Sequence, residues 1–271
     1  MKELIINSID EFKAVISSHD YHQWIYRGQN NYEYQLESSL FRAFRRNEKI
    51  RSATKMKRVH LIREKYEKEM IESFQKSCHL FLTTFPNMKD KFDWLSLMQH
   101  YGAPTRLLDF SLSPYVALYF SMYEATEEAA VYCINYSEIK KIDSSYYNNI
   151  DQKYSELMKT EKSIDQTLLV PFEPKFINER LFAQQGVFLI PNTLNFSHHE
   201  ILENYENSDF YLKLKINITQ FAEIQKELLK MNIRASSVYP GFEGFCKSFN
   251  TIGIIPIGNI RSLSELIIDM N

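Results

Sequence analysis

The segment from Gln99 to Phe120, QHYGAPTRLLDFSLSPYVALYF, constrains the fold more than any other part of the chain. Polar and turn-forming residues are crowded into it just before an apolar run: His100, Tyr101, Gly102, Pro104, Arg106, Asp109, Ser111 and Ser113. A pure core element has no use for so many polar groups, whereas a site that holds hydrogen-bonding side chains at the edge of a rigid scaffold needs them. The segment therefore predicts a turn, a short strand and a helix around a polar cluster.

The strand is expected between Arg106 and Ser111, after a turn shaped by Gly102 and Pro104. Its apolar residues are expected in the core: Leu107, Leu108 and Phe110. That alternation leaves Asp109 near the end of the strand, beside the helix that follows.

The helix is expected to begin after Ser113, a natural N-cap, with Pro114 at the first helical position, and to end near Met122. Its residues that are expected to pack on the sheet are Val116, Ala117, Tyr119 and Phe120. An alternative interpretation is a buried corner in which the polar residues only cap and brace one another.

A second cluster lies near the N-terminus, in Gln23–Gln29 (QWIYRGQ). Trp24, Ile25 and Tyr26 favour a strand, and Gly28 either ends it or lets another group approach the backbone. Arg27 then stands at the end of an apolar strand. It is either paired with an internal carboxylate such as that of Asp109 or presented to an anionic ligand, and the two roles are compatible.

The composition is that of an ordinary globular protein, with 44% hydrophobic and 24% charged residues in 271. A formal charge of −2 gives no general attraction to nucleic acid or to anionic membranes. The cysteines are few and far apart: Cys78, Cys133 and Cys246. We therefore expect a reducing compartment and neither disulfides nor a structural zinc. No apolar run is long enough for a membrane span, and we expect a cytoplasmic protein without membrane contact.

The first half of the chain is expected to be helical outside these two clusters. Ser8 and Glu11 predict the start of a helix over Ile9–Ser17, and a helical block is expected over about residues 39–98. Between Arg42 and Lys68 this block holds eleven Lys or Arg residues and only three Glu. The usual interpretation is a solvated helix face, and the alternative is a patch for nucleic acid or an acidic partner.

The second half is expected to alternate strands with helical or irregular segments. The strands are expected at residues 130–135, 187–190 and 211–216, the last at a sheet edge because lysines alternate with apolar residues. An irregular polar segment is expected over about residues 137–175, as a long loop with helical pieces up to about residue 167 and with Pro171 and Pro174 ending it. A helix is expected over residues 220–231 and a turn-rich segment over residues 236–245. His198, His199 and Glu200 lack the spacing of a zinc-binding helix, and no metal site is expected.

With these motifs the chain resembles the FRG domain family, which is named for an aromatic–Arg–Gly motif. The motif stands here as Tyr26–Gly28, and HYGAPTRLLDFSLSPYVALYF, NERLFAQQGVFL and VYPGFEGF resemble further blocks of the family in the same order. The resemblance covers about residues 24–245 and implies a single domain over residues 1–271. The family is largely bacterial, and the resemblance implies a link to phage defence or toxin–antitoxin systems.

A more distant resemblance is to ADP-ribosyltransferases, which bind NAD on a split sheet. Arg27 matches the Arg or His of their first strand, and Ser111 lies in a strand followed by a helix of similar pattern. The segment Gln184–Pro191, QQGVFLIP, is similar to their last motif, in which a Glu precedes a strand. The resemblance implies an α+β fold: a mixed split β-sheet with a large helical insertion, about residues 39–98, between the first strand and the central motif.

The same resemblance implies the site residues. The expected catalytic residues are Arg27, His100, Asp109, Ser111, Gln185 and Glu243. The expected nucleotide-binding residues are Tyr26, Arg27, Gly28, Gln29, Gln99, Tyr101, Arg106, Ser113 and Tyr119. Gln185, or Gly186 in a stricter register, stands where those enzymes carry the Glu that stabilises an oxocarbenium-like transition state, so the negative charge is missing. We therefore expect a slow enzyme, a silent binding module, or a carboxylate supplied by Asp109 or Glu243.

Two functions follow from these expectations. The first is an ADP-ribosyltransferase-like or NAD-consuming effector with NAD as substrate, a protein or nucleic-acid acceptor, and an antitoxin or defence partner. The second is a non-catalytic module that senses a nucleotide or a nucleic acid. A third interpretation is a structural protein whose polar cluster is buried and mutually paired. A cleft on which the predicted residues converge is expected only from the first two.

Overall fold

The computed structural model describes residues 2–54, 62–147, 149–159, 164–205 and 210–251. Its strands form one seven-stranded mixed sheet in the order β1-β7-β4-β2-β3-β6-β5. β1 pairs with β7 in parallel, whereas the other neighbours are antiparallel. The strands are β1 (Lys2–Ile6), β2 (Trp24–Gln29), β3 (Leu108–Ser111), β4 (Ala129–Asn135), β5 (Leu169–Phe172), β6 (Gly186–Pro191) and β7 (Tyr211–Ile216).

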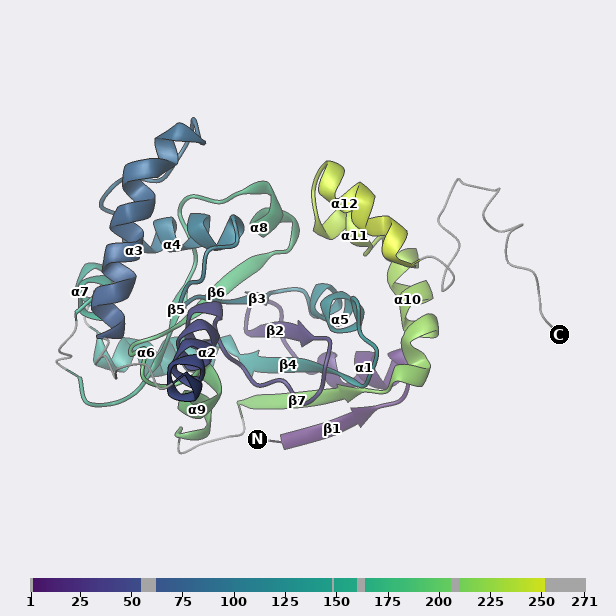
Figure 1. The fold of residues 1–271 in the computed structure, drawn as a ribbon. Helices are drawn as coiled ribbons and strands as arrows, with labels where there is room; N and C mark the ends of the chain where they lie inside the picture. The colour runs from purple at the N-terminus through teal and green to yellow at the C-terminus, as the bar shows by residue number, and fades with distance from the viewer. Residues whose placement is uncertain (1, 55–61, 148, 160–163, 206–209, 252–271) are drawn as a thin grey trace.

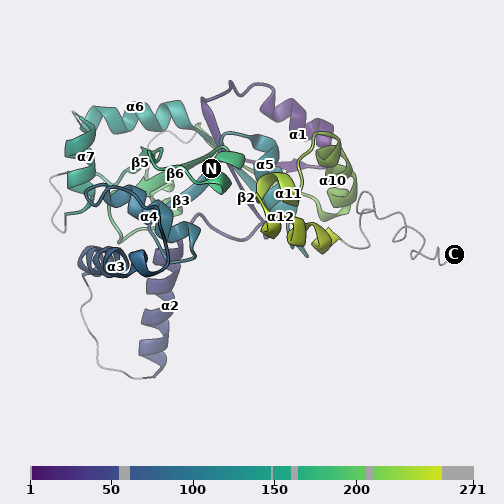
Figure 2. The same cartoon turned by 90° about the horizontal axis from the view of Figure 1, so that it is seen from above.

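Helices cover both faces of this sheet (Figures 1 and 2). The α-helices are α1 (Ile9–Ile16), α2 (Ser39–Ala53), α3 (Arg63–Ser77), α4 (Lys91–His100), α5 (Pro114–Met122), α6 (Tyr136–Tyr146), α7 (Ile150–Leu157), α8 (Glu179–Ala183), α9 (His198–Glu203), α10 (Phe221–Lys230), α11 (Ala235–Val238) and α12 (Phe242–Lys247). Short 3-10 turns occur at Cys78–Leu80, Ile218–Gln220 and Ser248–Thr251. Among the described residues, no helix has the length and apolar character that crossing a membrane requires.

One face of the sheet is divided between two groups of helices. The half made of β1, β7, β4 and β2 packs under α1, α5 and α10, whereas β6 and β5 pack under α3 and α4. The opposite face has one core, closed by α6 and α9. Figure 2 shows the two helical groups at opposite ends of the sheet, with α2 extending away from its body.

The two halves meet where β2 and β3 adjoin. Their register is given by the pair Tyr26 and Ser111, so Gly28 would face Asp109 if the ladder continued. Gly28 instead packs against the backbone of α5: a Cβ built on it would lie 2.0 Å from the carbonyl oxygen of Ala117. Only glycine permits this close approach of strand and helix.

Most elements expected from the sequence are confirmed. Ser8 and Ser113 cap α1 and α5 as predicted, each accepting a hydrogen bond from a backbone N–H three residues on. The central strand is confirmed with Leu107, Leu108 and Phe110 buried. The helical block over residues 39–98 is confirmed as α2, α3 and α4, although part of its basic stretch, residues 55–61, lies outside the described residues.

Three local expectations were wrong, and a fourth was confirmed in part. The helical pieces expected within residues 137–167 are present as α6 and α7, although they make up more of the segment than expected. β7 is not an edge strand, because β1 covers it and the alternating Lys213 and Lys215 lie along aromatic rings. Pro171 lies inside β5 rather than ending a segment, which the position of β5 at the sheet edge allows. The turn-rich segment over residues 236–245 contains α11 and most of α12.

Candidate functional site

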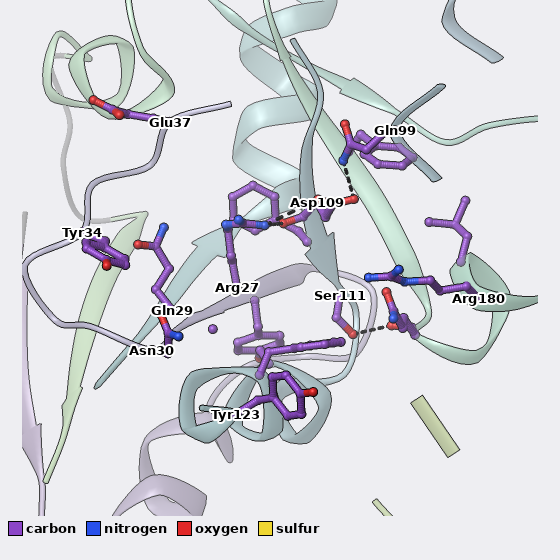
Figure 3. A pocket seen from close by; sticks show the side chains of 18 of the residues that line it. Arg27, Gln29, Asn30, Tyr34, Glu37, Gln99, Asp109, Ser111, Tyr123 and Arg180 are labelled. Carbon is purple, nitrogen blue, oxygen red and sulfur yellow. Dashed lines mark hydrogen bonds and ion pairs between the residues drawn. The ribbon is translucent and has the colours of Figure 1, made fainter. Parts of the chain in front are cut away.

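A cleft of about 920 Å³ opens at the boundary between β2 and β3. Its floor comes from the two strands, with Arg27 and Gln29 on β2 and Asp109 and Ser111 on β3. One wall is the segment that follows β2 and the start of α2, and the other comes from α4, α5, α8 and the segment after α11. Figure 3 shows these side chains around the cleft. A volume of this size is sufficient for a dinucleotide-sized ligand.

Arg27 lies in the middle of the cleft and bridges the two strands (Figure 3). Its Nη1 donates a hydrogen bond to the main-chain carbonyl of Asp109 at 2.8 Å and lies 3.7 Å from the Asp109 carboxylate. Burial lowers the pKa of the Arg27 guanidinium, and the nearby charge of Asp109 partly opposes this effect. Arg27 stays protonated, because an arginine side chain does not lose its proton in proteins. The Nε of Arg27 is buried without a hydrogen-bond partner among the described residues.

The carboxylate of Asp109 is held from two sides. Gln99, on the last turn of α4, donates a hydrogen bond from Nε2 to Oδ1 of Asp109 at 2.6 Å, and Arg27 lies on the side of Oδ2. The side chain of Asp109 is 52% exposed, so its free lone pairs face the cleft. Asp109 is thus a fixed negative charge at the cleft floor.

Ser111 also lines the cleft, with its hydroxyl already engaged. It donates to the carbonyl of Gln184 at 2.6 Å and accepts from the backbone N–H of Ser113 at 3.0 Å. Gln184 in turn donates from its side chain to the carbonyl of Val238. This chain of hydrogen bonds ties β3 to α8 and α11 and fixes the wall of the cleft.

The far wall, which comes from α4, α5, α8 and the segment after α11, combines cationic side chains with aromatic rings. Arg180 on α8 lies 4.8 Å from the ring centre of Tyr239, and Lys247 lies 4.7 Å from the same ring. Tyr123 lines the cleft beside them. His100, at the end of α4, faces this wall, and burial and the charge of Arg180 lower the pKa of its imidazole, against an opposing effect of Glu243. His100 is therefore neutral at neutral pH and able to accept a proton.

The near wall, formed by the segment after β2 and the start of α2, is polar and carries two arginines and two glutamates, Glu33 and Glu37. Arg42 and Arg45 on α2 line the cleft, and both donate hydrogen bonds to Glu37, Arg42 to its carbonyl and Arg45 to its carboxylate. Asn30, Tyr34 and Glu37 line the cleft from the segment that follows β2 (Figure 3). Arginines on both walls and in the centre favour an anionic ligand with phosphate groups.

The structure brings together most of the residues predicted for the site. Eight of them line the cleft: Tyr26, Arg27, Gly28, Gln29, Gln99, His100, Asp109 and Ser111. Tyr26 does so chiefly with its backbone, because its side chain is buried and its hydroxyl lies 3.0 Å from Nδ1 of His19.

Six predicted residues lie elsewhere. Gln185 is exposed at the turn between α8 and β6, with φ at +48°, and its neighbour Gln184 lines the cleft in its place. Glu243 is exposed on α12, 3.6 Å from Lys247, and Tyr101 is 57% exposed after α4. The other three are parts of the scaffold: Arg106, Ser113 and Tyr119.

Arg106 is the most deeply buried of these scaffold residues. It has no exposed surface and its Nε donates to both carboxylate oxygens of Glu67, at 2.8 and 2.9 Å. Its Nη1 donates to the carbonyls of Leu157 and Pro191. Arg106 therefore joins α3, α7 and β6 and has no face toward the cleft.

Sequence reasoning missed the residues that complete the walls, chiefly Arg180, Tyr123, Tyr239, Arg42 and Glu37. The signal for Arg180 was its position in NERLFAQQ, a block already singled out for its similarity to a known motif. Arg42 belongs to the basic stretch between Arg42 and Lys68, for which the usual interpretation was a solvated helix face. Tyr239 lies in VYPGFEGF, another block singled out for its resemblance to the family. Tyr123 and Glu37 carry no local signal, because only the fold brings them to the cleft. Among the described residues, no group of three His, Cys, Asp or Glu side chains has the arrangement of a metal site.

Comparison with known families supports the resemblance carried by these motifs. Residues 22–130 match the model of the FRG domain. The matched region contains β2, β3 and α5, and with them Arg27, Asp109 and Ser111. No curated protein and no solved structure matches the chain.

Proposed function

We propose that the cleft binds NAD and cleaves the bond between nicotinamide and ribose, so that ADP-ribose passes to a protein or nucleic-acid acceptor or to water. The observation that carries the proposal is the convergence of Arg27, Asp109 and Ser111, from two neighbouring strands, on one dinucleotide-sized cleft. Arg27 in the centre, with Arg180 and Arg42 on the walls, supplies the charge that a pyrophosphate requires.

The chemistry assigns roles to Asp109 at the floor and to His100 and two tyrosines on the wall opposite α2. The electrons of the broken C–N bond leave with nicotinamide, and the positive charge that develops on the ribose is stabilised by the Asp109 carboxylate. The acceptor then attacks the same ribose carbon, and the neutral imidazole of His100 takes the acceptor's proton. Tyr123 and Tyr239 supply aromatic faces on which a ring of the ligand can stack.

A specific observation favours a second candidate, a module that binds a nucleotide without turnover. The Asp109 carboxylate is already hydrogen-bonded to Gln99 and close to Arg27, and both contacts reduce the negative charge available to a ribose cation. Gln185, at the position of the usual Glu, is uncharged and exposed. In this case the cleft is a sensor whose signal is ligand binding itself.

The test uses NAD labelled in both halves, purified protein and a cell extract as the source of acceptors. Under the enzyme proposal, native protein releases nicotinamide or transfers label. The Asp109→Asn variant binds NAD but turns it over at least about a hundredfold more slowly, because it lacks the carboxylate charge. The Arg27→Ala variant binds NAD poorly. Saturable NAD binding without turnover in native protein supports the sensor. Failure of NAD to bind at all contradicts both. Asp10→Asn, a change at an exposed residue of α1, is the matched control.

For the cellular role we propose an effector in phage defence or in a toxin system, held silent by an antitoxin or defence partner. The proposal rests on the resemblance to the FRG family and on what that resemblance implies, and the family match covers residues 22–130. Induced expression of native protein should then arrest growth and deplete NAD, and expression of Asp109→Asn at the same level should not. Normal growth at a confirmed level of soluble native protein would contradict the proposal.

A further inference from the structure

Gln29 has a side-chain amide that is fixed in orientation but only half satisfied. Its Nε2 donates a hydrogen bond to the carbonyl of Gln35 at 3.3 Å, which identifies the nitrogen end of the amide. Its Oε1 is buried and has no hydrogen-bond partner among the described residues. A buried acceptor without a partner costs about 1–3 kcal/mol, so a native protein keeps one only where something else supplies the donor.

Gln29 lines the floor of the cleft. It is two residues beyond Arg27 on β2, so the two side chains leave the same face of the strand, and Figure 3 shows them extending to the same side. Arg27 contributes a buried donor without a partner among the described residues, its Nε. This part of the floor therefore holds one unpaired acceptor and one unpaired donor on the same face of β2, and Tyr34 adds an aromatic face beside Gln29.

We propose that Gln29 determines which nucleotide the cleft accepts, by accepting a hydrogen bond from an amino group of the ligand through Oε1. The complementary ligand group is an NH2 on a conjugated carbon next to an acceptor atom. NAD carries this chemistry twice, in the amino edge of adenine and in the carboxamide of nicotinamide. The inference rests on the proposed function, since it names the part of the nucleotide that Gln29 binds.

The amide keeps its orientation because of Gln35. If it turned over, Oε1 would face the carbonyl oxygen of Gln35 and the existing hydrogen bond would be replaced by a repulsion between two acceptors. A small tilt costs little, because the terminal torsion of a glutamine is broad and a 3.3 Å hydrogen bond is long. Oε1 can therefore turn toward a ligand in the cleft while Nε2 stays near Gln35, and a ligand with an oxygen in place of its amino group meets an acceptor.

The test compares three ligands on the native chain by calorimetry: NAD, its hypoxanthine analogue, which lacks the adenine amino group, and its 3-acetylpyridine analogue, which lacks the carboxamide NH2. We expect one analogue to bind at least about tenfold more weakly than NAD while the other binds like NAD. The weaker analogue identifies the end of NAD that lies against Gln29. Equal binding of all three would overturn the inference but leave the proposed function intact, and absence of NAD binding would overturn both.

The variant Gln29→Met removes both hydrogen-bonding atoms at similar size. It should lose the preference for NAD over the weaker analogue, bringing the ratio of the two dissociation constants from at least about ten to near one. Because the ratio is taken between two ligands on one variant, a general weakening caused by loss of the Gln35 contact cancels. Gln220→Met, outside the cleft at the start of α10, should keep the native ratio. A preference that survives in Gln29→Met would overturn the assignment.

Discussion

The guanidinium of Arg27 donates a hydrogen bond to the main-chain carbonyl of Asp109 at 2.8 Å, across the point where β2 and β3 separate. The register set by Tyr26 and Ser111 would place Gly28 opposite Asp109 in a continued ladder. The Arg27 side chain thus donates the hydrogen bond between neighbouring strands that a backbone N–H donates elsewhere in the sheet. Because the same guanidinium lines the cleft, the junction between the two halves of the sheet and the ligand site share one group.

Replacing Arg27 by alanine should therefore affect both binding and stability. The Asp109 carbonyl loses a charged donor, which we expect to lower the free energy of unfolding by about 1–2 kcal/mol. Loss of the central cation should weaken NAD binding by more than tenfold. Urea unfolding and calorimetry on the same preparation measure the two effects.

Arg46→Ala is the matched control, because Arg46 is exposed on α2 and does not line the cleft. It should change neither quantity by more than about 0.5 kcal/mol. Normal NAD binding by a folded Arg27→Ala protein would show that the cleft does not hold the nucleotide through this residue.

Gly28→Ala should unfold the protein readily. The added Cβ would lie 2.0 Å from the carbonyl oxygen of Ala117 and 2.4 Å from the backbone nitrogen of Ser121, so β2 and α5 would have to separate. We expect a loss of at least about 3 kcal/mol. Gly102, at φ +83° with open space around it, gives the comparison: Gly102→Asn should be nearly neutral, since asparagine tolerates positive φ. Thermal unfolding of both variants measures the two losses of stability. A Gly28→Ala protein as stable as the native one would contradict the close packing of β2 against α5.

The buried pair of Arg106 and Glu67 should show strong coupling. Both side chains are fully buried, so Arg106→Met or Glu67→Leu alone leaves an unpaired charge in the core and should cost about 3–5 kcal/mol. The double variant removes both charges and should be more stable than either single variant. A double-mutant cycle by urea unfolding tests this, and additive losses would contradict it.

Stability should fall in mild acid because of His198. Burial lowers the pKa of its imidazole to about 3, against about 6.5 in the unfolded chain. Between these values the unfolded state binds more protons, so the free energy of unfolding decreases as the pH falls from about 6.5 toward 3. His198→Gln should reduce this slope between pH 7 and pH 5, whereas exposed His79→Gln should leave it unchanged. Urea unfolding at several pH values measures the slope.

The sequence predicted what depends on local chemistry. Ser113 followed by Pro114 indicates a helix start wherever it occurs, and the alternation around Asp109 indicates a strand with one polar side chain. These rules placed Arg27, Asp109 and Ser111 on the right elements. The resemblance to ADP-ribosyltransferases concerns the fold and the reaction rather than single elements, and it is a hypothesis.

The sequence could not predict what depends on distant partners. Lys213 and Lys215 gave β7 the pattern of an edge strand, yet both lysines lie along the ring of Tyr32 and β1 covers the strand. Arg106, in the polar cluster, was expected to bind ligand, but Glu67 neutralises it in the core. An arginine has the same local signal in both settings, and only the position of a carboxylate 39 residues away decides between them.

The parallel pairing of β1 with β7 has a consequence for the order in which the chain can fold during synthesis. Residues 2–6 leave the ribosome long before their sheet partner at residues 211–216. Until that partner is made, β1 has no strand to pair with, and β4 exposes the edge that β7 will later occupy. β1 is thus among the last strands to enter the sheet although it precedes the other six in the chain, and these two edges must be kept from aggregation until β7 has been made.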